Sequence, residues 1–155
     1  MVVNKEQLIR QVQAEFKKQF KSEPTILTLT PGRINVIGEH TDYNEGLAMP
    51  AAIDRWICGA VGKSNNKSFT IYSLNYNEKV IITPQGGKKF NTIWKQLATA
   101  AIDHITIEFD IDIGINMVLG GNIPIGCGLS SSSALVISIT QTFCRLFLIQ
   151  MEDQQ

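Results

Sequence analysis

Cysteines are too few and too scattered in this sequence to form a disulfide framework or a zinc site. Cys58, Cys127 and Cys144 are odd in number and lie far apart, with no Cys-x-x-Cys spacing and no cluster of cysteine with histidine. This usage is typical of a protein that stays in a reducing compartment. We therefore expect a cytoplasmic protein without structural disulfides or structural zinc.

An excess of charge and a long apolar run are also absent. The 155 residues contain 14 Lys and Arg against 14 Asp and Glu, which gives no electrostatic reason to expect a nucleic-acid partner. No run approaches the roughly 18 apolar residues of a membrane span, and the first residues, MVVNKEQLIR, lack the apolar centre of a signal peptide. We expect a soluble protein that binds neither nucleic acid nor membrane.

The hydrophobic pattern changes from helical to strand-like and back along the chain. Asn4 and Gln7 have the spacing of a capping box, and apolar residues recur every four positions up to Phe20, which predicts a helix over residues 4–20. Strand-like segments then follow at 25–29, 33–37, 47–53, 56–62, 69–74, 79–83 and 111–119. This mixture predicts an α+β fold, and the length suits one domain over residues 1–155.

Two further helices are predicted in the second half of the chain. Asn91 is a candidate cap for one of them, and its inward side is expected to carry Ile93, Leu97, Ala100, Ala101 and His104. The last helix, over about 130–149, has a narrow polar stripe of Ser138, Gln141 and Arg145. Because most of its other positions are apolar, we expect this helix to be buried on most sides.

The first stretch with candidate functional residues is PGRINVIGEHTDYNEG, residues 31–46. Alternation along a strand places Ile34 and Val36 on one side, towards the core, and Arg33 on the other. Gly38 then permits a bend, after which a short turn is crowded with ionisable side chains.

Those side chains are Glu39, His40 and Asp42. Carboxylates accept hydrogen bonds from vicinal hydroxyl groups and imidazole can donate or accept, so sugar hydroxyls are suitable partners. A site of this kind rejects sugars that lack the right hydroxyl, since its own polar groups would stay unpaired. The alternative is that these residues only cap a turn, with Arg33 in a surface ion pair.

The second stretch is PIGCGLSSSSA, residues 124–134. Glycines allow the backbone to approach an anion closely, and a helix N-terminus adds free N–H groups and the positive end of its dipole. The stretch is not a Walker A loop, since no Gly-Lys-Ser/Thr follows, and Ser131 stands where the last glycine of GxGxxG would be. The alternative is an ordinary loop with a serine N-cap.

Together the two stretches resemble the galactokinase family of the GHMP kinase superfamily. The first resembles the galactokinase signature and the second the phosphate-binding motif of the whole superfamily, in the same order and at a matching spacing. The resemblance implies a GHMP-type N-terminal domain with a mixed or antiparallel sheet and packed helices, a sugar-binding motif at 31–46 and a phosphate-binding loop at 122–134. It also implies transfer of the γ-phosphoryl group of ATP to the C1 hydroxyl of galactose, with Mg²⁺.

The same resemblance implies a role for each matching residue. Glu39, His40 and Asp42 would bind sugar hydroxyls. Arg33 would bind near the C1 hydroxyl and act as a catalytic residue. The ATP phosphates would be held by Gly126, Gly128, Leu129, Ser130, Ser131 and Ser132. Ser132 would be the serine that approaches Mg²⁺.

One part of the family pattern is absent from these 155 residues. The aspartate that assists deprotonation of the sugar lies in a Cys-Gly-x-Met-Asp-Gln-like motif, and this sequence contains no such segment. We therefore expect the chain to be an N-terminal portion without its C-terminal domain, inactive by itself. We also expect the helix at 130–149 to leave an apolar surface exposed that favours self-association.

Three other functions are compatible with the same residues. The chain could be a non-catalytic module that binds galactose or nucleotide, or a kinase for another sugar such as N-acetylgalactosamine. It could also be an α+β domain without activity. Residues 41–46 resemble the galactose branch more than the N-acetylgalactosamine branch.

Overall fold

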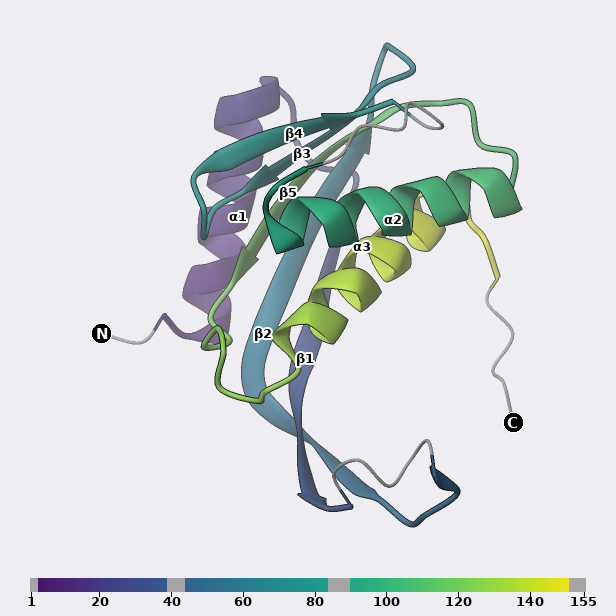
Figure 1. Cartoon of the computed structure of the whole chain (residues 1–155). Helices are drawn as coiled ribbons and strands as arrows, with labels where there is room; N and C mark the ends of the chain where they lie inside the picture. Colours follow the sequence, from purple (N-terminus) through teal and green to yellow (C-terminus); the bar gives the residue numbers. More distant parts are fainter. Residues whose placement is uncertain (1–2, 39–43, 84–89, 151–155) are drawn as a thin grey trace.

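A computed structural model describes residues 3–38, 44–83 and 90–150, which form three helices and five strands (Figure 1). In chain order they are α1 (Lys5–Phe20), β1 (Ile26–Ile37), β2 (Met49–Lys63), β3 (Phe69–Ser73), β4 (Glu78–Ile82), α2 (Ile93–Glu108), β5 (Ile115–Gly121) and α3 (Ser131–Phe147). The mixture confirms the predicted α+β class. α1 begins where the capping box predicted, because Asn4 and Gln7 bond each other's backbone N–H groups.

The strands form one mixed sheet in the order β1-β2-β5-β3-β4. β5 lies at its centre, antiparallel to β2 and parallel to β3. Four of the predicted strands merge into two, since β1 and β2 run through the predicted breaks. A register shift absorbs the break, because Pro31 pairs with Trp56 while Gly32 pairs with Ile53.

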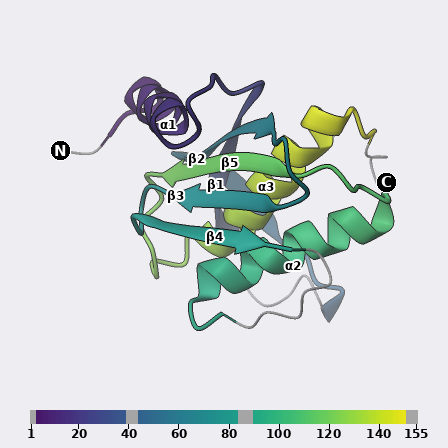
Figure 2. The same ribbon diagram turned by 90° about the horizontal axis from the view of Figure 1, so that it is seen from above.

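Helices cover both faces of the sheet, as Figure 2 shows from above. α1 packs on one face, where Leu8, Val12 and Phe16 are buried against β2, β3 and β5. α2 and α3 cover the other face and complete the larger core. No helix in the described part of the chain has the length and apolar composition needed to cross a membrane.

Beyond the helices, β1 and β2 continue as a two-stranded arm (Figure 1). Val36, predicted to face the core, lies on this arm and is 57% exposed. The prediction was wrong because alternation decides which side a residue takes but not how far the covering helices reach.

The buried side of α2 also differs from the predicted side. Its buried residues are Trp94, Ala98, Ala101, Ile102, Ile105 and Thr106. Ile93 is 70% exposed and His104 is exposed, so of the predicted stripe only Ala101 is buried. The helix begins after Thr92 rather than Asn91. Choosing Ile93 instead of Trp94 as the first inward residue turns the whole stripe by one position, about 100° around the axis.

α3 lies on the sheet through a small polar seam. Ser138 and Thr142 are fully buried, and the Thr142 hydroxyl contacts that of Thr28 on β1. Gly59 on β2 lies below them, and a Cβ there would be 2.7 Å from Thr142 Oγ1. Of the predicted polar stripe, Ser138 therefore faces the sheet and Arg145 faces solvent. A glycine in β2 sets how closely α3 approaches.

Gly59→Ala is expected to lower the free energy of unfolding by about 1–3 kcal/mol, since the added methyl group overpacks the seam. Urea unfolding measures the change. Gly62→Ala is the matched control on the same strand, because its Cβ would meet the tip of the Phe16 ring at 3.3 Å. A loss for Gly59→Ala no larger than for Gly62→Ala would contradict this account of α3 packing.

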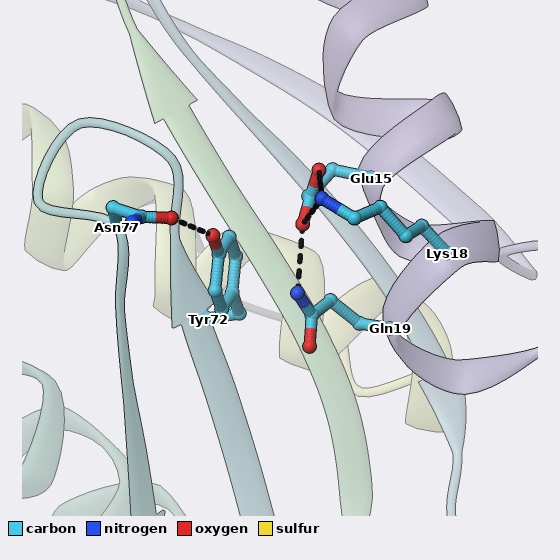
Figure 3. A network of polar contacts seen from close by, with 5 residues as sticks. All are labelled: Glu15, Lys18, Gln19, Tyr72 and Asn77. Atoms are coloured by element: carbon cyan, nitrogen blue, oxygen red, sulfur yellow. Dashed lines mark hydrogen bonds and ion pairs between the residues drawn. The ribbon is translucent and has the colours of Figure 1, made fainter.

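A network of polar contacts includes residues of α1, Tyr72 of β3 and Asn77 of the turn before β4 (Figure 3). The Glu15 carboxylate accepts a hydrogen bond from Gln19 at 2.7 Å and one from Lys18 at 3.2 Å. The Tyr72 hydroxyl donates to Asn77 at 2.5 Å. The Glu15 side chain is only 12% exposed, and the Gln19 hydrogen bond, helped by Lys18, lowers its pKa although burial opposes the shift.

This network predicts a pH dependence of stability. Because the folded state lowers the pKa of Glu15 below its ordinary 4.5, the stabilisation is complete above that value and is lost as the pH falls through the folded pKa. Glu15→Gln removes this titration, so its free energy of unfolding should fall less than that of the wild type between about pH 6 and about pH 3. Urea unfolding at several pH values provides the test. Parallel curves for the two proteins would contradict it.

Candidate functional site

The predicted phosphate loop connects the central strand β5 to α3. Gly126 and Gly128 have φ of 76° and 68°, and an added Cβ at either would meet nothing within 4 Å. These glycines are therefore required by backbone conformation and not by crowding. Ser130 has left-handed φ and ψ and its side chain makes no cap hydrogen bond. The alternative, an ordinary loop with a serine N-cap, therefore fails for Ser130. The Ser130 side chain leaves the first-turn amides of α3 uncovered.

The two sequence stretches meet at the backbone of β1. The Arg33 N–H donates to the Leu129 carbonyl at 3.4 Å. A Cβ on Gly32 would lie 3.1 Å from that carbonyl oxygen and 3.2 Å from Ile53. The glycine is what allows the strand and the loop to approach so closely.

The predicted residues of the first stretch are only partly within the described chain. Arg33 lies on β1, opposite Ala52, with an exposed side chain. Gly38 has a φ of 91°, in agreement with the predicted bend. Glu39, His40 and Asp42 lie outside the described residues, so their arrangement stays a prediction.

A pocket of about 160 Å³ opens beside the loop. Tyr76 and Trp94 lie among its lining residues with their rings stacked, the centroids 5.7 Å apart and the planes 9° from parallel. Its polar lining consists of Ser73, Asn75, Ser131 and Ser132. The pocket therefore joins an apolar, aromatic wall to the two serines at the start of α3, which suits a flat ring that carries an anionic tail.

The sequence interpretation missed this aromatic wall. Tyr76 belongs to the turn between β3 and β4, and Trp94 to the first turn of α2. Neither residue forms a local motif with the serines, and the sheet brings them together. The one available signal was Trp94 itself, a large aromatic residue at the beginning of a predicted helix.

The described residues offer limited support for a metal ion. No group of three or more His, Cys, Asp or Glu side chains gathers in the described part of the chain. Ser132 is exposed at the pocket and has a hydroxyl group to offer. Mg²⁺ commonly takes one or two protein ligands and completes its shell with phosphate and water, so a single hydroxyl here fits a metal that arrives with a nucleotide.

Comparison with known proteins gives two family matches that follow this geometry. The galactokinase galactose-binding signature matches residues 14–63, which include β1 and β2. The GHMP kinases N terminal domain matches residues 91–155, which include the loop and α3. Galactokinases of Staphylococcus carnosus and Streptococcus thermophilus are 32% and 38% identical and align with 94% and 92% of this chain. Both the family matches and these relatives show that the chain is similar to galactokinases among the GHMP kinases.

Solved structures of this superfamily share the fold. Galactokinase of Lactococcus lactis, solved in complex with galactose, superposes with a TM-score of 0.80 at 29% identity, over 90% of this chain and 37% of that one. Mevalonate kinase of Methanococcus jannaschii superposes with a TM-score of 0.69 at 19% identity, over 83% of this chain and 42% of that one. The GHMP N-terminal fold is therefore common to enzymes of different names.

The chain spans about 38% of the length of the curated galactokinases it matches. Its second match is to the N-terminal domain of the superfamily. It therefore corresponds to the N-terminal portion of a galactokinase, as predicted.

Gly32→Ala is expected to push the loop away from β1, because the methyl group would contact the Leu129 carbonyl. Stability should fall by about 1 kcal/mol, and the Arg33 amide should exchange its hydrogen faster with solvent as its bond to Leu129 is lost. Hydrogen exchange followed by NMR measures this. An unchanged exchange rate at Arg33 would show that the contact does not depend on the glycine.

Proposed function

We propose that this chain carries the galactose-binding and phosphate-binding parts of a galactokinase, which transfers the γ-phosphoryl group of ATP to the C1 hydroxyl of galactose. Residues 31–46 form the sugar-binding motif and residues 122–134 the phosphate-binding loop. The observation that carries the proposal is the contact between Arg33 and Leu129. It joins the strand that leads into the sugar motif to the loop that leads into α3.

The pocket beside the loop supports binding of the nucleotide. An adenine ring suits the wall that contains Tyr76 and Trp94, since flat aromatic surfaces stack favourably. The phosphates would then extend over Gly126, Gly128 and Leu129 to the serines Ser130, Ser131 and Ser132. Backbone N–H groups at a helix N-terminus attract such anions.

The chemistry is a displacement at phosphorus. The C1 oxygen forms a bond to the γ-phosphorus, and the bond from that phosphorus to the bridging oxygen of ADP breaks. The hydroxyl proton passes to a base, a role that the family gives to the aspartate of the motif absent from these 155 residues. Catalysis of this step depends on positioning and on neutralising the charge of the transferring group. The exposed guanidinium of Arg33 and the N-terminus of α3 would share that role. Mg²⁺, held in part by Ser132, would neutralise phosphate charge when bound.

Sugar recognition is assigned to Glu39, His40 and Asp42. Hydrogen bonds from hydroxyl groups to carboxylates are stronger than neutral ones, and they discriminate between sugars by the position of each hydroxyl. The family match over residues 14–63 supports galactose as the sugar.

This chain is expected to bind both ligands without turnover. The motif that supplies the deprotonating aspartate in the family does not occur in the sequence.

The chain's cysteines at positions 58, 127 and 144 are free thiols, which supports the cytoplasm as its location. Ile137 on α3 and Leu148 directly after it are 53% and 88% exposed, and these apolar groups support self-association at high concentration.

Asp42→Ala is expected to weaken galactose binding by about tenfold or more, since a hydrogen bond to a charged group contributes roughly 1.5–3 kcal/mol. Affinity for Mg–ATP should stay within about twofold of the wild type. Isothermal titration calorimetry with each ligand separately measures both constants, and a sugar-phosphate assay in parallel measures turnover.

Asp112→Ala is the matched control for this experiment. Asp112 is an exposed carboxylate paired with Lys67, and its loss should leave both affinities unchanged. Galactose binding that is equally strong in Asp42→Ala and the wild type would contradict the assignment of Asp42. Absence of binding of either ligand to the wild-type chain would contradict the proposed function of the isolated chain.

A further inference from the structure

The exit of β5, directly before the phosphate loop, is held on one side by the side chain of Asn75. Asn75 Nδ2 donates to the Gly121 carbonyl at 2.8 Å, and the Gly121 N–H donates to Asn75 Oδ1 at 2.8 Å. This pair of bonds copies the pairing of a neighbouring strand at a point where β3 has already ended at Ser73. The amide side chain thus extends the sheet by one residue.

On the other side of the same exit, Asn122 binds the backbone of Trp56 twice. The Trp56 N–H donates to Asn122 Oδ1 at 2.6 Å, and the Asn122 N–H donates to the Trp56 carbonyl at 3.0 Å. Asn122 Nδ2 also donates to the carbonyl of Val3, before α1, at 2.8 Å. One side chain therefore ties the start of the loop to β2 and to the segment that precedes α1.

The loop needs such anchors because it has few of its own. Gly126 and Gly128 take conformations that glycine adopts freely. The intrinsic backbone preferences of these two residues therefore do not fix the conformation of the loop. At the far end, the bond from Arg33 to Leu129 is long, at 3.4 Å. The four short side-chain hydrogen bonds of Asn75 and Asn122 are at the near end.

We propose that Asn75 and Asn122 are positioning residues for the phosphate loop, fixing its conformation before a nucleotide binds. The inference rests on the proposed nucleotide-binding function and names the residues on which its affinity depends. Both polar atoms of the Asn75 amide bond Gly121, so Asn75 acts through the backbone although it also lines the pocket. Asn122 likewise acts through the backbone of Trp56 and Val3.

Asn66 provides a matched control at the other end of β5. Its Oδ1 accepts a hydrogen bond from the Ser68 N–H at 3.0 Å, and its carbonyl accepts one from the Gly114 N–H at 3.1 Å. Asn66→Ala keeps the backbone bond to Gly114 and removes only the side-chain bonds to Ser64 and Ser68, in the turn between β2 and β3 and far from the loop in the fold. A general loss of stability would affect this variant as it affects Asn75→Ala and Asn122→Ala.

The first measurement needs no ligand. NMR order parameters of the Gly126 and Gly128 amides in the free wild-type chain should be near the rigid value of about 0.85, and should fall towards about 0.6 in Asn75→Ala and Asn122→Ala. They should be unchanged in Asn66→Ala. Equal order in all four proteins would overturn the proposal, and so would equal disorder.

The second measurement is calorimetric titration with Mg–ADP and, separately, with galactose. Affinity for Mg–ADP should fall about tenfold in Asn75→Ala and Asn122→Ala, while affinity for galactose changes less than about twofold. Asn122→Asp keeps the acceptor for the Trp56 N–H, so its affinity for Mg–ADP should fall less than that of Asn122→Ala. If Asn122→Ala fails to fold, a smaller but selective loss of Mg–ADP affinity in Asn122→Asp still tests the proposal. A similar loss for both ligands in every variant would reduce the two asparagines to a structural role.

The two measurements separate this proposal from the function on which it rests. In one outcome, the loop amides are ordered in the wild type and less ordered in the two variants, but the wild type does not bind Mg–ADP. This outcome would support the anchoring by the asparagines and contradict the proposed function. Binding of Mg–ADP that is equally tight in all variants would uphold the function and overturn the anchoring.

Discussion

The close approach of β1 to the loop before α3 is the contact on which the site depends. It joins Arg33 to Leu129, two residues far apart in sequence, and it requires that no side chain stand between the two backbones. Gly32 meets that requirement directly. Gly59 meets it indirectly, because α3 can settle on β2 only where the strand carries no Cβ below Thr142. Two glycines in neighbouring strands therefore set the distance between the sugar motif and the phosphate loop.

The sheet gives this contact a rigid base. β5 is paired along both edges, and helices pack on both faces, so the strand that delivers the loop is fixed in every direction. Buried, close-packed elements of this kind position a site more accurately than loops alone. The arm of β1 and β2 lacks this support, since it extends beyond the helices and carries exposed apolar residues such as Val36 and Ile37. The proposed phosphate-binding loop therefore belongs to the rigid part of the molecule, whereas the proposed sugar-binding residues follow β1 in the sequence.

Local signals in the sequence predicted local structure well, and failed where distant segments decide. The capping box of Asn4 predicted the start of α1, and Gly38 predicted the bend at the end of β1. The prediction of the buried side of α2 was wrong, because the packing of Trp94 into the core decides which side is buried. No local sequence pattern indicates that packing. The pocket wall and the two asparagines at the exit of β5 were missed for the same reason. Their partners are adjacent only after the sheet has formed.

The central claim is that the sugar motif and the phosphate loop form a single site. Chemical-shift mapping of the isotopically labelled chain with galactose, and then with Mg–ADP, tests it most directly. We predict that both ligands shift the amide signals of Gly32, Arg33 and Leu129, because these residues form the contact between the two motifs. Galactose shifts confined to the arm, together with nucleotide shifts confined to the loop and α3, would show two independent sites and contradict the account.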